Sequence, residues 1–347
     1  MNEAILEPDL PIIDPHHHLW DWRSRLPFLP AEMSHPFEAI LRQSPRYLLD
    51  ELLADTGSGH NVVGTVYVQC GAFYRADGPE AMQPVGETEF VNGVAAMAAS
   101  GVYGATRACA GIVGHADLGL GDAVAEVLDA HLAAGGGRFR GIRHMMAHDD
   151  DRAVLGPLAH AAPNLCASPQ VRSALKHFAQ RKLSLDIWVV EPQLPEAVEL
   201  ARVFPEVPMV IDHVGTPVGL GRYAGKRDER FAGWKASMAS LAELPNVHMK
   251  LGGLGMPFPG FEGMGPDVRP SSEALAKAWK PYIESCIELF GADRCMFESN
   301  FPVDRWGADY PTLWNAFKQI AASASADEKA QLFAGTAARF YRLEGLA

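Results

Sequence analysis

Long basic runs and long apolar runs are both missing from this sequence. Its 347 residues carry 42 acidic and 30 basic side chains, a net charge of −12, and no stretch of Lys or Arg forms a basic stripe. We therefore expect no nucleic-acid partner. No window approaches the ~20 apolar residues of a membrane helix, and the opening MNEAILEPDLPIID lacks the basic start of a signal peptide. We expect a cytoplasmic protein without a membrane partner; a homo-oligomer is compatible with this composition.

Cysteine is scarce, and a dinucleotide-binding glycine motif is absent. The cysteines are odd in number, scattered and never in CxxC spacing, at Cys70, Cys109, Cys166, Cys286 and Cys295. This pattern argues against a disulfide framework and against a zinc clamp, so we expect reduced, mostly buried thiols. No GxGxxG opens a helix after the first apolar run, which weighs against a nucleotide-binding open sheet.

Eight short apolar runs alternate with segments of helical periodicity. The runs cover residues 10–14, 61–70, 109–114, 139–144, 183–190, 207–213, 246–253 and 294–299, and the clearest helical segments are 122–135, 168–182 and 272–291. This alternation predicts an α/β protein with a (β/α)8 barrel, spanning residues 1–347 as a single domain. Two long insertions, 19–60 and 254–271, follow the first and seventh runs and are expected over the active-site face.

The stretch IIDPHHHLWDW places three histidines at the end of the first run. Side chains alternate along a strand, so we expect Asp14, His16 and His18 on one face and His17 on the other. A purification tag would be longer and lie at a terminus. A lone strand histidine is usually structural, but two on one face predict a site.

Two other runs end in polar residues. His213 closes the sixth run in VIDHVGTP, where it is either a third imidazole of the site or a turn residue. In CMFESNFPVD, Glu298 and Asn300 share one face and Asp304 follows shortly after. Polar groups at an apolar strand end are costly to bury without a purpose, which favours function, although Asp304 could instead pair with Arg305.

Candidate substrate-binding residues come from the middle of the chain. The fourth run, FRGIRHMMAHDD, supplies Arg143 and His144, together with Arg140 and His148. A guanidinium at a barrel mouth suits a substrate carboxylate, and a surface salt bridge to the following aspartates is the alternative. Trp188 and Lys250 would line the pocket or fill a core layer.

Taken together, the segments DPHHHLWD, GIRH, DHVGTP, KLGGLGMP, FESNFPVD and GTAARFYRL resemble the amidohydrolase superfamily, in its amidohydrolase-2 branch. That branch contains lactonases of sugar lactones and of 2-pyrone dicarboxylates, together with decarboxylases. The resemblance runs over nearly the whole chain. It implies an enzyme, a (β/α)8 barrel and a small-molecule substrate.

The resemblance carries over to particular positions. The family's D-x-H-x-H matches Asp14, His16 and His18, its D-H-x-G matches His213, and its strand-eight motif matches residues 298–302. The family's Asp, a metal ligand and general base, is here Asn300, which cannot take a proton. Glu298, Asp304 or a histidine of the cluster would have to replace it.

A binuclear centre is not expected, because the strand-eight Asp is missing, the fifth run ends without a His and the fourth run ends without a Lys that could bridge two ions. One divalent ion, zinc or manganese, could be held by His16, His18 and His213, and a metal-free site using His and Arg is an equal alternative. The first hypothesis is hydrolysis of a lactone in carbohydrate or aromatic catabolism, with Arg143 holding a substrate carboxylate. The alternatives are a metal-dependent decarboxylase or carbon–carbon hydrolase, and a non-catalytic binding barrel.

Overall fold

Eight parallel strands form the centre of the molecule, of which a computed structural model describes residues 3–29 and 32–346. Neighbours in the sheet follow chain order: β1 (Ile12–His17), β4 (Val62–Val68), β5 (Arg107–Gly114), β6 (Phe139–Met145), β7 (Ser184–Trp188), β8 (Met209–Ile211), β9 (Val247–Leu251) and β10 (Cys295–Phe297). The last strand returns to the first, because the amide of Asn300 donates to the carbonyl of His16 at 2.8 Å and the amide of His18 to Phe301 at 2.8 Å. The predicted (β/α)8 barrel is confirmed.

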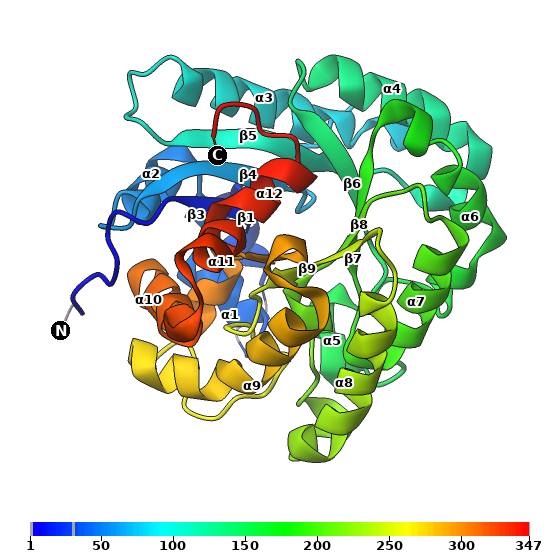
Figure 1. The fold of residues 1–347 in the computed structure, drawn as a ribbon. Coiled ribbons are helices and arrows are strands. Elements are labelled where there is room, and N and C mark those ends of the chain that lie inside the picture. The colour runs from blue at the N-terminus through cyan, green and yellow to red at the C-terminus, as the bar shows by residue number, and fades with distance from the viewer. Residues whose placement is uncertain (1–2, 30–31, 347) are drawn as a thin grey trace.

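Helices surround this barrel (Figure 1). The larger ones are α2 (Leu49–Thr56), α3 (Val85–Ala99), α4 (Val124–Ala134), α6 (Pro169–Leu175), α7 (Leu194–Val203), α8 (Arg227–Ala242), α9 (Ser272–Phe290) and α10 (Tyr310–Ile320). The expected helices at 122–135 and 272–291 match α4 and α9, whereas α6 ends at Leu175, earlier than expected. No helix of the described residues is both long and apolar enough to cross a membrane.

Alternation along the strands separates two apolar layers. Residues such as Ile12 and Ile187 face the surrounding helices, whereas Ile13 and Val210 belong to a separate cluster. The C-terminal segment, with α11 (Ala326–Ala330) and α12 (Thr336–Phe340), packs against that second cluster. Tyr341 is fully buried there, and its hydroxyl donates to Asp186 at 2.7 Å. One end of the barrel is therefore closed by the chain's own C-terminal segment.

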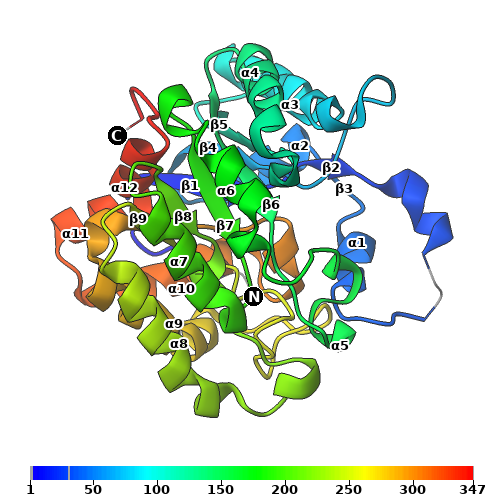
Figure 2. The ribbon, with the colours of Figure 1, turned by 90° about the vertical axis from the view of Figure 1, so that its right-hand side faces the viewer.

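The two insertions lie near the other end. Within 19–60, β2 (Trp20–Asp21) pairs antiparallel with β3 (Arg46–Tyr47), and α1 (Glu38–Gln43) lies between them in the chain. Figure 2 shows β2, β3, α1 and α5 (Arg152–Leu155) together on the side away from α11 and α12. The second insertion contacts the first, since the ring of Phe258 packs on that of Phe37 with centroids 5.5 Å apart. Residues 30 and 31 of the first insertion lie outside the described residues.

Candidate active site

A pocket opens at the carboxyl ends of the strands and holds about 580 Å³ of space, part of it open to solvent. Its polar lining comes from residues at or just after five different strands: His18, Cys70, Arg143, His213 and Asn300. Active sites of this fold are built at this face. The structure therefore places five residues that the sequence singled out in one pocket: His18, His213, Asn300, Arg143 and Trp188.

The three histidines of β1 divide between the two sides of the strand. His16 and His18 face one another with ring centroids 4.9 Å apart, and His16 lies 4.6 Å from His213. His17 points the other way, where its Nε2 lies 2.8 Å from the Thr65 hydroxyl. Burial lowers the pKa of His17 to about 3, so this ring is neutral and structural.

Asp14 does not share the face of His16, contrary to the strand pattern. It accepts hydrogen bonds from the Ser299 hydroxyl at 2.6 Å and from Tyr310 of α10 at 3.2 Å. The register of β1 against β4 shifts between Asp14 and His17, and this irregularity interrupts the simple alternation. Asp14 thus links β1 to Ser299 and α10 and does not line the described pocket.

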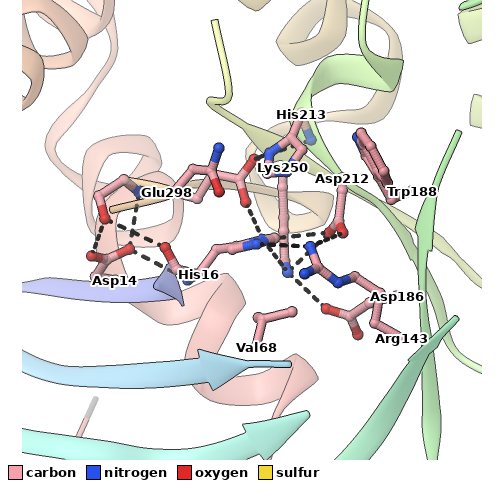
Figure 3. A network of polar contacts seen from close by, with 12 residues as sticks. Asp14, His16, Val68, Arg143, Asp186, Trp188, Asp212, His213, Lys250 and Glu298 are labelled. Carbon is pink, nitrogen blue, oxygen red and sulfur yellow. Dashed lines mark hydrogen bonds and ion pairs between the residues drawn. The ribbon is translucent and has the colours of Figure 1, made fainter. Parts of the chain in front are cut away.

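A layer of buried charges lies beneath the pocket floor (Figure 3). Lys250 is fully buried, with its Nζ 2.7 Å from Asp186, 3.0 Å from Asp212 and 3.1 Å from His16 Nδ1. Although burial lowers the pKa of an ammonium, the carboxylates of Asp186 and Asp212 raise the pKa of Lys250 above its ordinary value. Lys250 therefore stays charged and stabilises the two buried aspartates, and it is not among the residues that line the described pocket.

Arg143 stands at the boundary between this layer and the pocket. Its Nη2 donates to the carbonyl of Gln69, and its Nη1 lies 3.2 Å from His16 Nε2 and 3.7 Å from Asp212. Burial, followed by the charge of Lys250, lowers the pKa of His16 to about 4, so this ring is neutral at pH 7. The positive charges nearest the pocket floor come from Arg143 and Lys250.

Glu298 and His213 form a close, buried polar pair of the site. The carboxylate accepts from His213 Nδ1 at 2.6 Å and from the His213 amide at 3.0 Å. Burial alone would raise the pKa of Glu298, but His213 and His16 hold it at about 2. The backbone of His213 is in the left-handed region, with φ 58°. Gly253 packs so closely against it that a Cβ added to Gly253 would lie 2.4 Å from the Cβ of His213. Strain and glycine at this turn are consistent with a functional position.

Asn300 connects His18 to a second buried carboxylate. Its Nδ2 donates to Asp304 at 2.8 Å, and its Oδ1 lies 3.2 Å from His18 Nε2, while His18 Nδ1 lies 2.8 Å from the Val68 carbonyl. Burial raises the pKa of Asp304 to about 7, and Gly255 also donates to it at 2.9 Å. Neither Asp304 nor Glu298 lines the pocket, because Asn300 and His213 lie between them and the cavity.

Other sequence candidates lie elsewhere. His144 follows Arg143 and so faces the opposite side of β6, where it accepts from the Leu118 amide at 3.1 Å. Arg140 binds carbonyls of Gly137 and Phe139, and His148 lies 3.2 Å from Asp150. These residues are outside the described pocket.

The structure adds residues that the sequence interpretation did not select. Asp212 is fully buried, and His16 and Lys250 hold its pKa well below the usual range despite burial. Asp212 directly precedes His213 in the segment DHVG, and an acidic residue beside a predicted site histidine could have indicated it from the sequence. Apart from Trp188, the aromatic residues that line the pocket are Trp20, Trp22, Phe37 and Phe258, which come from the two insertions and have no sequence spacing that would reveal them.

One group among the described residues has the spacing of metal ligands. His16, His213 and Glu298 place one donor atom each within 4.8 Å of one another. The group differs from the three-histidine set by Glu298 in place of His18, whose Nδ1 faces a backbone carbonyl. Two imidazoles and a carboxylate are donors that suit zinc.

Comparison with known proteins agrees with this architecture. The chain is 35% identical over 337 residues to the uncharacterized protein y4mH of Sinorhizobium fredii, covering 96% of this chain and 99% of that one. It is 29% identical over 337 residues to the L-fucono-1,5-lactonase of Burkholderia ambifaria, covering 96% of each chain.

Solved structures with the same overall fold are also found. An amidohydrolase from Burkholderia multivorans with bound HEPES has a TM-score of 0.70 at 25% identity, and the structure with bound Zn has 0.70 at 24%; each match covers 95% of this chain and 99% of the other. The family model described as Amidohydrolase matches residues 13–343. The chain belongs to the amidohydrolase family, on its lactonase-like side, and is a hydrolase.

Proposed function

We propose that the protein hydrolyses a lactone, and that His213 is the general base. The observation that carries this proposal is the His213–Glu298 pair at the pocket floor. Glu298 accepts the Nδ1 proton of His213, so the neutral form of this imidazole would carry its lone pair on Nε2. A base oriented by a buried carboxylate is the arrangement that activates nucleophiles in many hydrolases.

The reaction would proceed by water attack on the lactone carbonyl. His213 would take a proton from the water as its oxygen bonds to the carbonyl carbon. The carbonyl electrons would move to the oxygen, and Arg143 would stabilise that charge. Collapse would break the ring C–O bond, and protonated His213 would return the proton to the leaving alkoxide. The product would be a hydroxy acid.

The group His16, His213 and Glu298 also fits one divalent ion. The two oxygens of Glu298 lie 2.6 Å from His213 Nδ1 and 2.8 Å from His16 Nδ1, so a cation at this group would bind where the imidazoles now meet the carboxylate. Bound there, zinc or manganese would polarise the carbonyl or the attacking water, and would replace protons that the histidines share with Glu298. The Burkholderia multivorans amidohydrolase with bound Zn supports testing zinc first.

Replacing His213 by alanine tests the proposed base. We expect kcat on a panel of five- and six-membered lactones, followed by pH-stat, to fall about 10²- to 10⁴-fold, the usual contribution of a general base. His177→Ala is the matched control, because His177 pairs with Asp122 at the surface. Retained turnover in a folded His213→Ala variant would reject the proposal, and carbon dioxide release would favour a decarboxylase.

Metal content is a separate test. We expect protein purified without a His tag or chelator to contain up to one equivalent of zinc or manganese, and we expect chelation to lower lactone turnover. Glu298→Gln should weaken metal retention, because it removes the only carboxylate of the group. Metal-free protein with full turnover would show that Arg143 polarises the carbonyl unaided. Cytoplasmic location, homo-oligomer formation and the absence of a nucleic-acid or membrane partner stay predictions.

A further inference from the structure

The pocket above the polar floor is almost entirely apolar. Its remaining lining residues are aromatic or aliphatic and form what we call the apolar wall: Trp20, Trp22, Phe37, Ile40, Leu41, Met145, Leu158, Trp188, Met256, Phe258 and Val303. Most of them belong to, or pack on, a hydrophobic cluster that is separate from the main core. The wall is thus an apolar surface that the two insertions and the ends of neighbouring strands build around the cavity.

The rings of the wall stack in two groups. Trp20 and Trp22 are nearly parallel with centroids 4.8 Å apart, and Trp20 also stacks on His18 at 6.1 Å. Phe258 packs against Phe37 at 5.5 Å and against Trp188 at 6.0 Å. The first group follows β1 and the second joins α1, β7 and the loop after β9. A ligand in this cavity meets aromatic rings from several segments.

The indole N–H groups of two wall tryptophans already have hydrogen-bond acceptors. The indole N–H of Trp20 donates to the Ser44 carbonyl at 2.7 Å, and that of Trp188 donates to the Thr216 hydroxyl at 3.1 Å. A sugar lactone would therefore find few partners for its hydroxyls above the floor. Each buried hydroxyl left unpaired weakens binding by roughly tenfold or more.

The floor is also poorly suited to a polyanionic substrate. Arg143 is the one Lys or Arg that lines the described pocket, and it is already engaged by Gln69, His16 and Asp212. Glu298 and the acidic layer add negative charge directly below. A substrate with two carboxylates would lack a second cation.

Resting on the proposed lactone hydrolysis, we infer that the substrate is a lactone with an aryl or similarly flat apolar substituent. The ring carbonyl lies over His213 and Arg143, and the substituent packs against the apolar wall. Aromatic side chains bind such groups through both buried area and ring stacking. Trp22 is the wall residue best suited to a test, because it is only partly buried and lies outside the strands of the barrel, so we expect its variant to fold.

The experiment compares three lactones with the same enzyme: δ-valerolactone, δ-phenyl-δ-valerolactone and L-fucono-1,5-lactone. We expect kcat/KM for the phenyl lactone to exceed that for the parent by about tenfold or more, mainly through KM, as expected for added stacking and apolar burial. Trp22→Ala should reduce this ratio by about tenfold. Phe28→Ala is the control, because Phe28 is an exposed aromatic of the same insertion outside the pocket.

Two results would overturn the inference while leaving lactone hydrolysis standing: highest kcat/KM on the sugar lactone, or a phenyl-to-parent ratio near one. If none of the three is hydrolysed, the proposed reaction fails, and binding of the corresponding lactams by calorimetry still tests the wall. Tighter binding of the phenyl lactam than of the parent lactam, lost in Trp22→Ala, would support the wall. Equal binding would reject it.

Discussion

At the scale of single residues, Lys250 has the most demanding position. It is fully buried and neutralises Asp186 and Asp212, to which no other Lys or Arg of the described residues lies as close. Lys250→Met would leave two buried carboxylates without this partner, and breaking such a pair costs about 3–5 kcal/mol. We expect a loss of this size in the free energy of unfolding, measured by denaturant titration.

Lys235→Met is the matched control for this substitution. Lys235 is exposed and pairs with Glu288 at 3.4 Å at the surface. Surface pairs contribute about 0–1 kcal/mol, so this variant should remain close to the parent protein. Equal losses in both variants would contradict the role given to Lys250.

Asp304 makes a pH-dependent contribution to stability. Its pKa is about 7 in the folded protein because of burial, against an ordinary value of 3.8. Between these values the folded state holds a proton that the unfolded chain has released, so this residue's contribution to stability falls as pH rises from about 4 to 7. The shift corresponds to roughly 4 kcal/mol at most.

Asp304→Asn should remove this dependence. Asparagine keeps an acceptor for Asn300 but loses one for the Gly255 amide, which costs a pH-independent amount. We therefore expect the stability of the variant relative to the parent protein to increase as pH rises from 4 to 7. The measurement is the free energy of unfolding of both proteins at four pH values. Parallel profiles for the two proteins would refute the assignment.

At the scale of elements, the strand order and most inward faces could be predicted from the sequence. Eight apolar runs became the eight strands, and alternation correctly placed His16 with His18 and His17 on the other side. Alternation failed at Asp14, because the register shift in β1 depends on pairing with β4. A bulge of this kind leaves no mark in the hydrophobic pattern.

Contacts between elements were beyond the sequence pattern. The Asp212–Lys250 pair depends on the register of β8 against β9, in which Val210 lies beside His248. The apolar wall depends on how two loops fold back over the barrel. Periodicity describes one element at a time, so it indicated the loops as covers without indicating which side chains point into the cavity.

At the scale of the whole molecule, we propose that residues 1–347 form one domain. Among the described residues, one hydrophobic core extends from Ile12 of the first strand to Phe333 near the C-terminus. The C-terminal segment also closes the end of the barrel that the site does not use. A single unfolding transition is the expected result, and two separate transitions would contradict it.

Acid should destabilise this domain through its buried neutral histidines, of which His131 is the clearest. It lies 2.8 Å from the Thr88 hydroxyl and 2.8 Å from the His115 carbonyl, and burial lowers its pKa to about 4. The unfolded chain takes up this proton near pH 6.5, so stability is lost as pH falls from about 6.5 to 4. The shift corresponds to roughly 3 kcal/mol from His131 alone.

His131→Phe tests this contribution within the same denaturation curves. Phenylalanine keeps the stacking on Phe139, whose ring lies 4.9 Å away, but leaves Thr88 and the His115 carbonyl without partners. The variant should be less stable at pH 7 and should lose less further stability between pH 6.5 and 4 than the parent protein. His160→Ala, at an exposed position, should keep the parent slope. An unchanged slope in His131→Phe would mean that protonation of other groups drives acid unfolding.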